Sequence, residues 1–114
     1  IPTGDVVGVD ERLDFRIGRT LGEEHLDDVL TGLPAATELT ARGSLRCASA
    51  TLTVSSDPAF RDYVLFTPTS RDAVAIEPYT CPTDAVHLEE RGIDAGWRVL
   101  PAGRSQRFTW RIDV

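Results

Sequence analysis

The spacing of apolar and polar residues predicts β-strands over most of the chain. Residues 107–114 alternate strictly between polar and apolar side chains. The apolar positions of this segment are Phe108, Trp110, Ile112 and Val114. A period of two residues is typical of a strand with one buried and one solvent-facing side. Residues 50–56 repeat the pattern, with Leu52 and Val54 as the apolar positions, so we expect a half-buried strand in each segment.

Shorter runs between turn signals predict further strands. The segments are 11–17, 36–41, 44–48, 60–67, 72–77 and 97–100. We expect Arg42-Gly43 to form a tight turn, and a turn rich in Pro, Ser and Arg to separate 60–67 from 72–77. Residues 20–33 have some helical character, but glycines bracket them closely, so a loop or a single turn is expected. Many short strands joined by turns predict an all-β sandwich, formed by one domain or by part of one.

Composition excludes several classes of protein. The chain has 114 residues, of which 41% are hydrophobic and 26% charged, as in a globular domain. It has no apolar run of the roughly 18 residues that a membrane span requires, and no signal peptide is visible. The net charge is −6 and the 12 basic residues are interspersed with acidic ones. This argues against a nucleic-acid partner, which clustered Lys and Arg would bind.

The two cysteines and the first residue bear on location and completeness. Cys47 and Cys81 match no metal-ligand spacing, so we expect two reduced thiols in a cytoplasmic protein. The chain begins with Ile1 and contains no methionine. A separately translated polypeptide begins with Met, so we expect residues 1–114 to be part of a longer protein that carries the rest of any site.

Glu77 has the clearest candidate chemistry. The apolar run before it, Ala73–Ile76, does not alternate, which predicts a strand buried on both sides. Pro78 follows directly, and a residue before proline is pushed into an extended conformation. We therefore expect the strand to end at Glu77, with a carboxylate that is held in one direction and partly shielded from water, as a general base requires. The alternative is a solvated charge at a strand end.

Other polar residues offer weaker signals. Asp27 and Asp28 are adjacent, so at most one of them faces a site, and either could simply cap a turn. His25 and His87 are the two histidines of the chain, and we expect both at the surface. No catalytic Ser/His/Asp arrangement and no glycine-rich phosphate loop is recognisable.

Five stretches together carry a resemblance to a known family. They are PTGDVVGVDERLDFR at 2–16, HLDDVL at 25–30, YVLFTP at 63–68, AVAIEPYTCPTDA at 73–85, and the closing Leu100–Gly103 turn with the Phe108–Trp110 strand. In this order they resemble the C-terminal portion of the aldose 1-epimerase, or galactose mutarotase, family. The stretch from Glu77 to Ala85 is the most specific part. The resemblance implies that residues 1–114 belong to a large antiparallel β-sandwich, the galactose mutarotase-like supersandwich, whose N-terminal portion lies outside this chain.

The resemblance also implies an activity. Such enzymes interconvert the α and β anomers of a free aldose without a cofactor or metal. A glutamate takes the proton of the C1 hydroxyl, a histidine protonates the ring oxygen, and the opened sugar recloses on its other face. Glu77 falls on the position of the base, and Asp27 on that of an aspartate that binds a sugar hydroxyl. The family's acid histidine lies in the N-terminal half, so this chain alone should be a poor catalyst, lacking roughly 10²–10⁴-fold of acid catalysis.

Departures from the family pattern leave alternatives open. Many members carry a glutamine where this chain has Val64, which puts one sugar contact in doubt. Tyr79 would either stack on the sugar or pack within the protein. One alternative is a non-catalytic carbohydrate-binding β-sandwich. Another is a relative that acts on sugar phosphates, for which Arg61 and Arg71, on either side of the YVLFTP strand, would supply positive charge.

Overall fold

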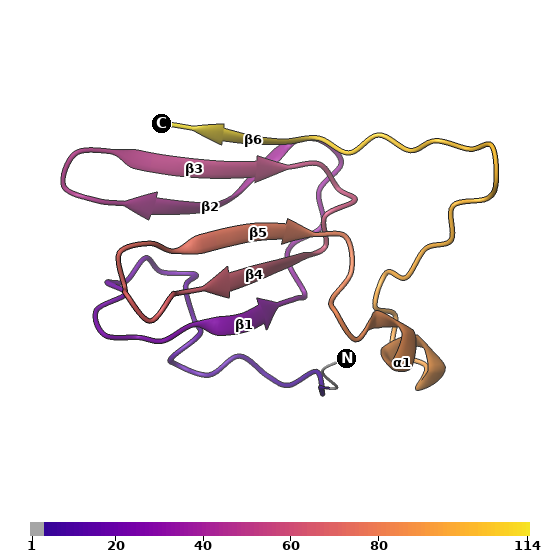
Figure 1. Cartoon of the computed structure of the whole chain (residues 1–114), viewed down its shortest axis with the longest axis horizontal. Helices are drawn as coiled ribbons and strands as arrows, with labels where there is room; N and C mark the ends of the chain where they lie inside the picture. The colour runs from indigo at the N-terminus through magenta and orange to yellow at the C-terminus, as the bar shows by residue number, and fades with distance from the viewer. Residues whose placement is uncertain (1–3) are drawn as a thin grey trace.

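Strands dominate the fold, as the computed structural model of the chain shows for residues 4–114 (Figure 1). Sheet A has the order β1 (Asp27–Leu30), β4 (Asp62–Phe66), β5 (Ala75–Tyr79), and sheet B has the order β2 (Thr40–Arg46), β3 (Thr51–Ser56), β6 (Trp110–Asp113). All neighbouring strands are antiparallel. The predicted all-β class is therefore confirmed. Pro2 and Thr3, which open the first stretch of the resemblance, lie outside the described residues.

The strand β2 runs through the position where we expected a tight turn. Arg42 and Gly43 lie inside β2, and the pairing with β3 shifts register between Ala41 and Gly43. This shift is a β-bulge, in which the extra residue, Arg42, has no partner across the ladder. The turn prediction was wrong because a glycine after a polar residue also suits a bulge. The true hairpin turn is at 47–50, where the Cys47 amide donates to the Ala50 carbonyl at 2.9 Å.

The last strand forms as predicted, but its apolar side is not in a core. β6 pairs with β3, with Ile112 opposite Val54. Trp110 is 55% exposed and Ile112 48% exposed, whereas the alternation predicted burial. The ring of Phe108 contacts that of Phe60, with centroids 5.8 Å apart. Periodicity thus identified the strand, but among residues 4–114 no element covers its apolar side.

The strand that carries Glu77 differs from the prediction in two ways. β5 runs from Ala75 to Tyr79, so Glu77 lies at its centre and Pro78 continues it. This is possible because β5 is the edge strand of sheet A, where a proline without an N–H need not interrupt the ladder. All five residues of β5 are partly exposed, so the expected burial on both sides was also wrong. The predicted turn before β5 is confirmed by the bond from the Arg71 amide to the Pro68 carbonyl.

One buried hydrogen bond joins the two sheets. The Tyr63 hydroxyl of β4 donates to Ser56 Oγ of β3 at 2.8 Å, and the two residues are 4% and 0% exposed. Leu26, 1% exposed, lies just before β1, and its amide donates to Thr67 Oγ1 at 2.9 Å. Few side chains are fully buried in this small interior, and polar ones are among them.

The predicted strand over 11–17 is absent. The Leu13 amide donates to the Asp10 carbonyl at 3.2 Å and to Asp10 Oδ1 at 2.9 Å, which closes a turn. The Arg16 amide donates to Asp14 Oδ1 at 3.1 Å. Aspartate side chains that bond the backbone two or three residues ahead favour turns over strands, and this overrides the apolar alternation of the segment.

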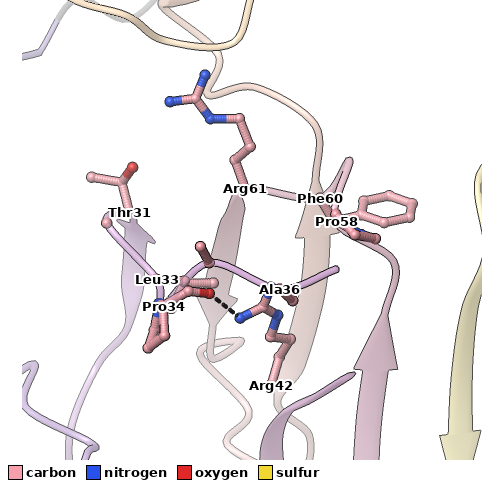
Figure 2. A pocket seen from close by; sticks show the side chains of 10 residues that line it. Thr31, Leu33, Pro34, Ala36, Arg42, Pro58, Phe60 and Arg61 are labelled. Atoms are coloured by element: carbon pink, nitrogen blue, oxygen red, sulfur yellow. Dashed lines mark hydrogen bonds between the residues drawn. The ribbon is translucent and has the colours of Figure 1, made fainter. Parts of the chain in front are cut away.

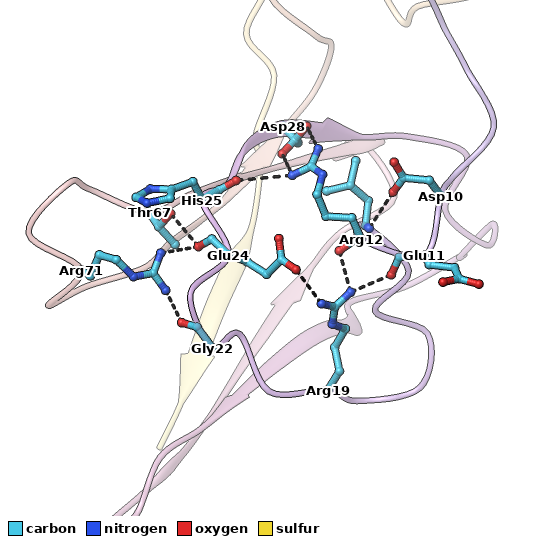
Figure 3. Close-up of polar contacts among 11 residues, drawn as sticks. Asp10, Glu11, Arg12, Arg19, Gly22, Glu24, His25, Asp28, Thr67 and Arg71 are labelled. Carbon is cyan, nitrogen blue, oxygen red and sulfur yellow. Dashed lines mark hydrogen bonds and ion pairs between the residues drawn. The ribbon is translucent and has the colours of Figure 1, made fainter.

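Arginines hold this N-terminal segment against sheet A (Figure 3). Arg12 donates to both carboxylate oxygens of Asp28 in β1, at 3.1 and 2.9 Å. Arg19 donates to Glu24 Oε1 at 2.9 Å, and Arg71 donates to the carbonyl oxygen of Glu24. The segment is therefore fixed by polar contacts rather than by strand pairing.

A short helix, which the sequence analysis did not predict, follows β5. The helix α1 (Ala85–Glu90) buries Ala85 and Leu88, and Gly92, at φ 78°, ends it. Residues 97–100 pair with no strand, so the short strand expected there is absent. In the described part of the chain, no helix has the length and apolar character needed to cross a membrane.

Candidate functional site

The four side chains predicted for a site lie on one side of sheet A. Val64 is directly opposite Glu77, and Asp27 is directly opposite Phe66. Residues opposite each other across an antiparallel pair share a side of the sheet, as do residues two apart along a strand. Tyr79 therefore shares a side with Glu77, and Asp27 with Val64. The register brings all four residues onto the same surface.

We call this surface the Glu77 face. It consists of Asp27, Val29, Asp62, Val64, Phe66, Ala75, Glu77 and Tyr79. Val29 and Phe66 are each 41% exposed, and Asp27 is exposed as well. The face thus offers carboxylates and apolar side chains together, a combination that suits a ligand with both hydroxyl groups and C–H surfaces.

Glu77 and Tyr79 form a pair within the Glu77 face. The Tyr79 phenol lies close to the Glu77 carboxylate, and interaction with this carboxylate raises the pKa of Tyr79. Both residues are partly buried. Tyr79 therefore stays neutral at neutral pH, beside the carboxylate of Glu77.

Of the two adjacent aspartates, Asp27 points to the Glu77 face and Asp28 to the opposite side. The bidentate bond from Arg12 lowers the pKa of Asp28 and occupies its carboxylate. Asp27 makes no side-chain hydrogen bond within the described residues. The expectation that at most one of the pair faces a site agrees with this arrangement, in which Asp27 is the available carboxylate.

Sequence reasoning missed Asp62, which lies opposite Tyr79 on the Glu77 face. Asp62 is 2% exposed, and its Oδ2 has no hydrogen-bond partner among the described residues. Burial raises the pKa of Asp62, against the opposing effects of the Thr31 hydroxyl and the Arg61 charge. Parity alone would have found it, because Asp62, Val64 and Phe66 are spaced two apart along one strand.

Neither histidine lies on the strands of sheet A. His25 precedes β1 and appears beside Thr67 in Figure 3. His87, on α1, bonds Asp84 with 2.6 Å between Nδ1 and Oδ1, and this bond raises the pKa of the imidazole. Both histidines are exposed, as expected. The Glu77 face therefore has candidate bases but no imidazole of its own.

Two cavities lie away from Glu77. The first, about 300 Å³, is at the end of β1 and beside Phe60 and Arg42, and the second, about 280 Å³, is beside Arg71 and Thr67. The two arginines considered for a sugar phosphate are far apart in the fold and already engaged. Arg61 bonds Asp94 at 2.6 Å before β4, and Arg71 bonds backbone carbonyls after it. Residues 4–114 contain no group of three His, Cys, Asp or Glu side chains suited to a metal ion.

Comparison with known proteins adds no relative. No family model matches the chain, and neither the curated proteins nor the solved structures contain a match. Inferences about function therefore rest on the residues and their geometry.

Proposed function

We propose that the Glu77 face is the base-bearing side of an aldose 1-epimerase site, and that this chain is the C-terminal portion of the enzyme's mutarotase-like β-sandwich. The convergence of Asp27, Val64, Glu77 and Tyr79 on one side of sheet A carries the proposal. These residues come from three strands, of which β1 is distant in sequence from the consecutive strands β4 and β5. A shift of one residue in any strand would turn its side chains to the opposite side, so the shared face is a demanding outcome.

The dimensions of the Glu77 face suit a monosaccharide. Asp27 and Glu77 lie on the two outer strands of sheet A. Asp27 is opposite Phe66 and Glu77 is opposite Val64, so their positions differ by two residues along the strands. Strand spacing and rise put such positions roughly 12 Å apart. Two hydrogen bonds of about 2.8 Å, one at each carboxylate, leave a gap of about 6 Å, which is the size of a pyranose ring. Val64 and the exposed Phe66, both on the central strand β4, lie between them, where the C–H surface of a sugar would rest.

The resemblance supplies the reaction, and these positions assign its steps to residues. Glu77 takes the proton of the C1 hydroxyl as the C1–O5 bond breaks, and the ring oxygen receives a proton from an acid. Rotation about C1–C2 and reclosure, with the two proton transfers reversed, give the other anomer. Tyr79 lies beside the Glu77 carboxylate, and Asp27 binds a distal hydroxyl. Following the resemblance, the acid is a histidine on the N-terminal portion of the same cytoplasmic enzyme, and no cofactor is used.

Polarimetry on freshly dissolved α-D-glucose and α-D-galactose tests the proposal. Together with the proposed N-terminal portion that supplies the acid, the protein should accelerate anomer exchange above the spontaneous rate. Glu77→Gln should lower that acceleration by roughly 10²–10⁴-fold, as expected for loss of a general base. Glu38→Gln is the matched control, because Glu38 is an exposed glutamate outside the strands. Full activity in Glu77→Gln, or equal losses in the two variants, would exclude Glu77 as the base.

A non-catalytic carbohydrate-binding module is the second candidate. It is favoured by the absence of an imidazole on the Glu77 face and by the distance of both described cavities from Glu77. Under this alternative the protein binds a monosaccharide without accelerating anomer exchange, and Glu77→Gln alters binding alone. Calorimetry on the same pair of variants, performed with the polarimetry, separates the two functions.

A further inference from the structure

The bulge in β2 directs Arg42 into the first cavity (Figure 2). Because Arg42 has no partner across the ladder, it departs from the regular alternation of side chains along β2. Bulges often re-aim a side chain in this way beside functional sites. In Figure 2 the guanidinium of Arg42 lies beside Pro34 and Ala36, which form part of the cavity wall. The side chain of Arg61 extends away from this guanidinium.

Arg42 is the uncompensated charge of this cavity. Its Nη1 donates to the Pro34 carbonyl at 2.6 Å, but its Nε is buried without an acceptor among residues 4–114. No carboxylate of the described chain forms an ion pair with it, although the chain has 18 acidic residues. Arg61, by contrast, is neutralised by Asp94. A buried donor without an acceptor is unfavourable, and an oxyanion would relieve it.

The remaining wall of the cavity is mostly apolar. Leu33, Pro34, Pro58 and Phe60 line it, and the Thr31 hydroxyl adds a polar group. Small-molecule sites combine such an apolar lining with a few polar groups that fix orientation. The volume of about 300 Å³ is at the lower end of the range for such sites.

We propose that this cavity binds a small organic anion. Its carboxylate or phosphate oxygens pair with the Arg42 guanidinium, whose Nε has no acceptor among the described residues. Its organic body lies against Phe60 and the prolines. The site is separate from the Glu77 face and does not depend on the proposed function.

Amide chemical-shift titrations by NMR test the site at low salt. Benzoate supplies a carboxylate on an apolar ring, benzyl alcohol the same ring without charge, and inorganic phosphate the charge without the ring. We expect benzoate to shift the amides of residues 31–36 and 41–43 saturably. Benzyl alcohol should bind roughly 10- to 100-fold more weakly, the range for loss of a charge-assisted hydrogen bond.

Two arginine variants on the same strand provide the matched comparison. Arg42→Gln should weaken benzoate binding by a similar roughly 10- to 100-fold, whereas Arg46→Gln, at the exposed end of β2, should leave it unchanged. Arg42→Lys keeps the positive charge but loses the paired N–H groups of the guanidinium. We expect this variant to preserve the fold and to bind benzoate with an intermediate affinity. Equal binding of benzoate and benzyl alcohol, phosphate binding as tight as benzoate, unchanged affinity in Arg42→Gln, or no saturable shift would each overturn the assignment.

Discussion

The buried bond between Tyr63 and Ser56 gives a quantitative test of how the two sheets are joined. Tyr63→Phe removes the phenol oxygen and leaves Ser56 Oγ, in a residue that is 0% exposed, without its partner. A buried polar group left in this state costs about 1–3 kcal/mol. Ser56→Ala leaves the Tyr63 hydroxyl unpartnered in a residue that is 4% exposed, so we expect a loss of similar size.

The double variant separates the hydrogen bond from the loss of packing. With both polar atoms removed, neither member of the pair is left as an unsatisfied buried group, so the combined loss should be smaller than the sum of the single losses by about 1 kcal/mol or more. Urea unfolding followed by far-UV circular dichroism measures each free energy, provided that the denaturant slope m stays constant. Tyr79→Phe is the control, because the Tyr79 phenol lies beside the partly exposed Glu77 and its removal should cost less. Strictly additive single losses, or a loss in Tyr79→Phe as large as in Tyr63→Phe, would refute the buried bond.

Two further variants test the described environment. Burial raises the folded-state pKa of Asp62, so ionisation of Asp62 destabilises the fold as pH rises above the unfolded value of 3.8. Asp62→Asn should therefore raise the free energy of unfolding by about 1 kcal/mol at pH 7 and leave it unchanged below about pH 4. A lower free energy of unfolding at pH 7 would contradict this. Gly96, at φ +76°, would place an added Cβ 2.8 Å from Arg61 Cδ and 3.0 Å from the Thr80 carbonyl oxygen, whereas Gly103, at φ +75°, has open space. Gly96→Ala should thus cost more than Gly103→Ala by about 1–3 kcal/mol in urea unfolding, and equal losses would exclude the close contact.

Local pattern predicted the strands better than it predicted what covers them. A short run between turn signals located β4, and the two-residue alternation located β3 and β6, because side-chain period depends on the strand alone. It failed over 11–17, where Asp10 and Asp14 form turns through their own side chains. It also failed at Pro78, since a proline ends a central strand but is tolerated on an edge, and edge position follows from the order of strands in the sheet.

The candidate site was predictable in its members but not in its surroundings. Side chains alternate between the two sides of a strand. This alternation puts Glu77 and Tyr79 on the same side of β5, and it puts Val64 on one side of β4. The register then decides whether those sides coincide. The burial of Asp62 and the bulge at Arg42 depend on contacts between segments distant in sequence, and no local signal distinguishes a bulge at Arg42-Gly43 from the turn that we expected there.

The exposed surface of the chain bears on both the uncovered strand and the incomplete site. A compact monomer of 12.5 kDa exposes about 6,200 Å², whereas this chain exposes 8263 Å². Seven of the fourteen large hydrophobic side chains that are exposed lie between Trp97 and Val114, so the surplus is concentrated in the C-terminal segment that ends in β6. β6 is also an edge strand, with one side of its backbone free to pair. Under the proposed function, the N-terminal portion that supplies the acid histidine would also cover this surface. That single partner would then account for the exposed apolar side of β6 and would bring the acid that the Glu77 face lacks.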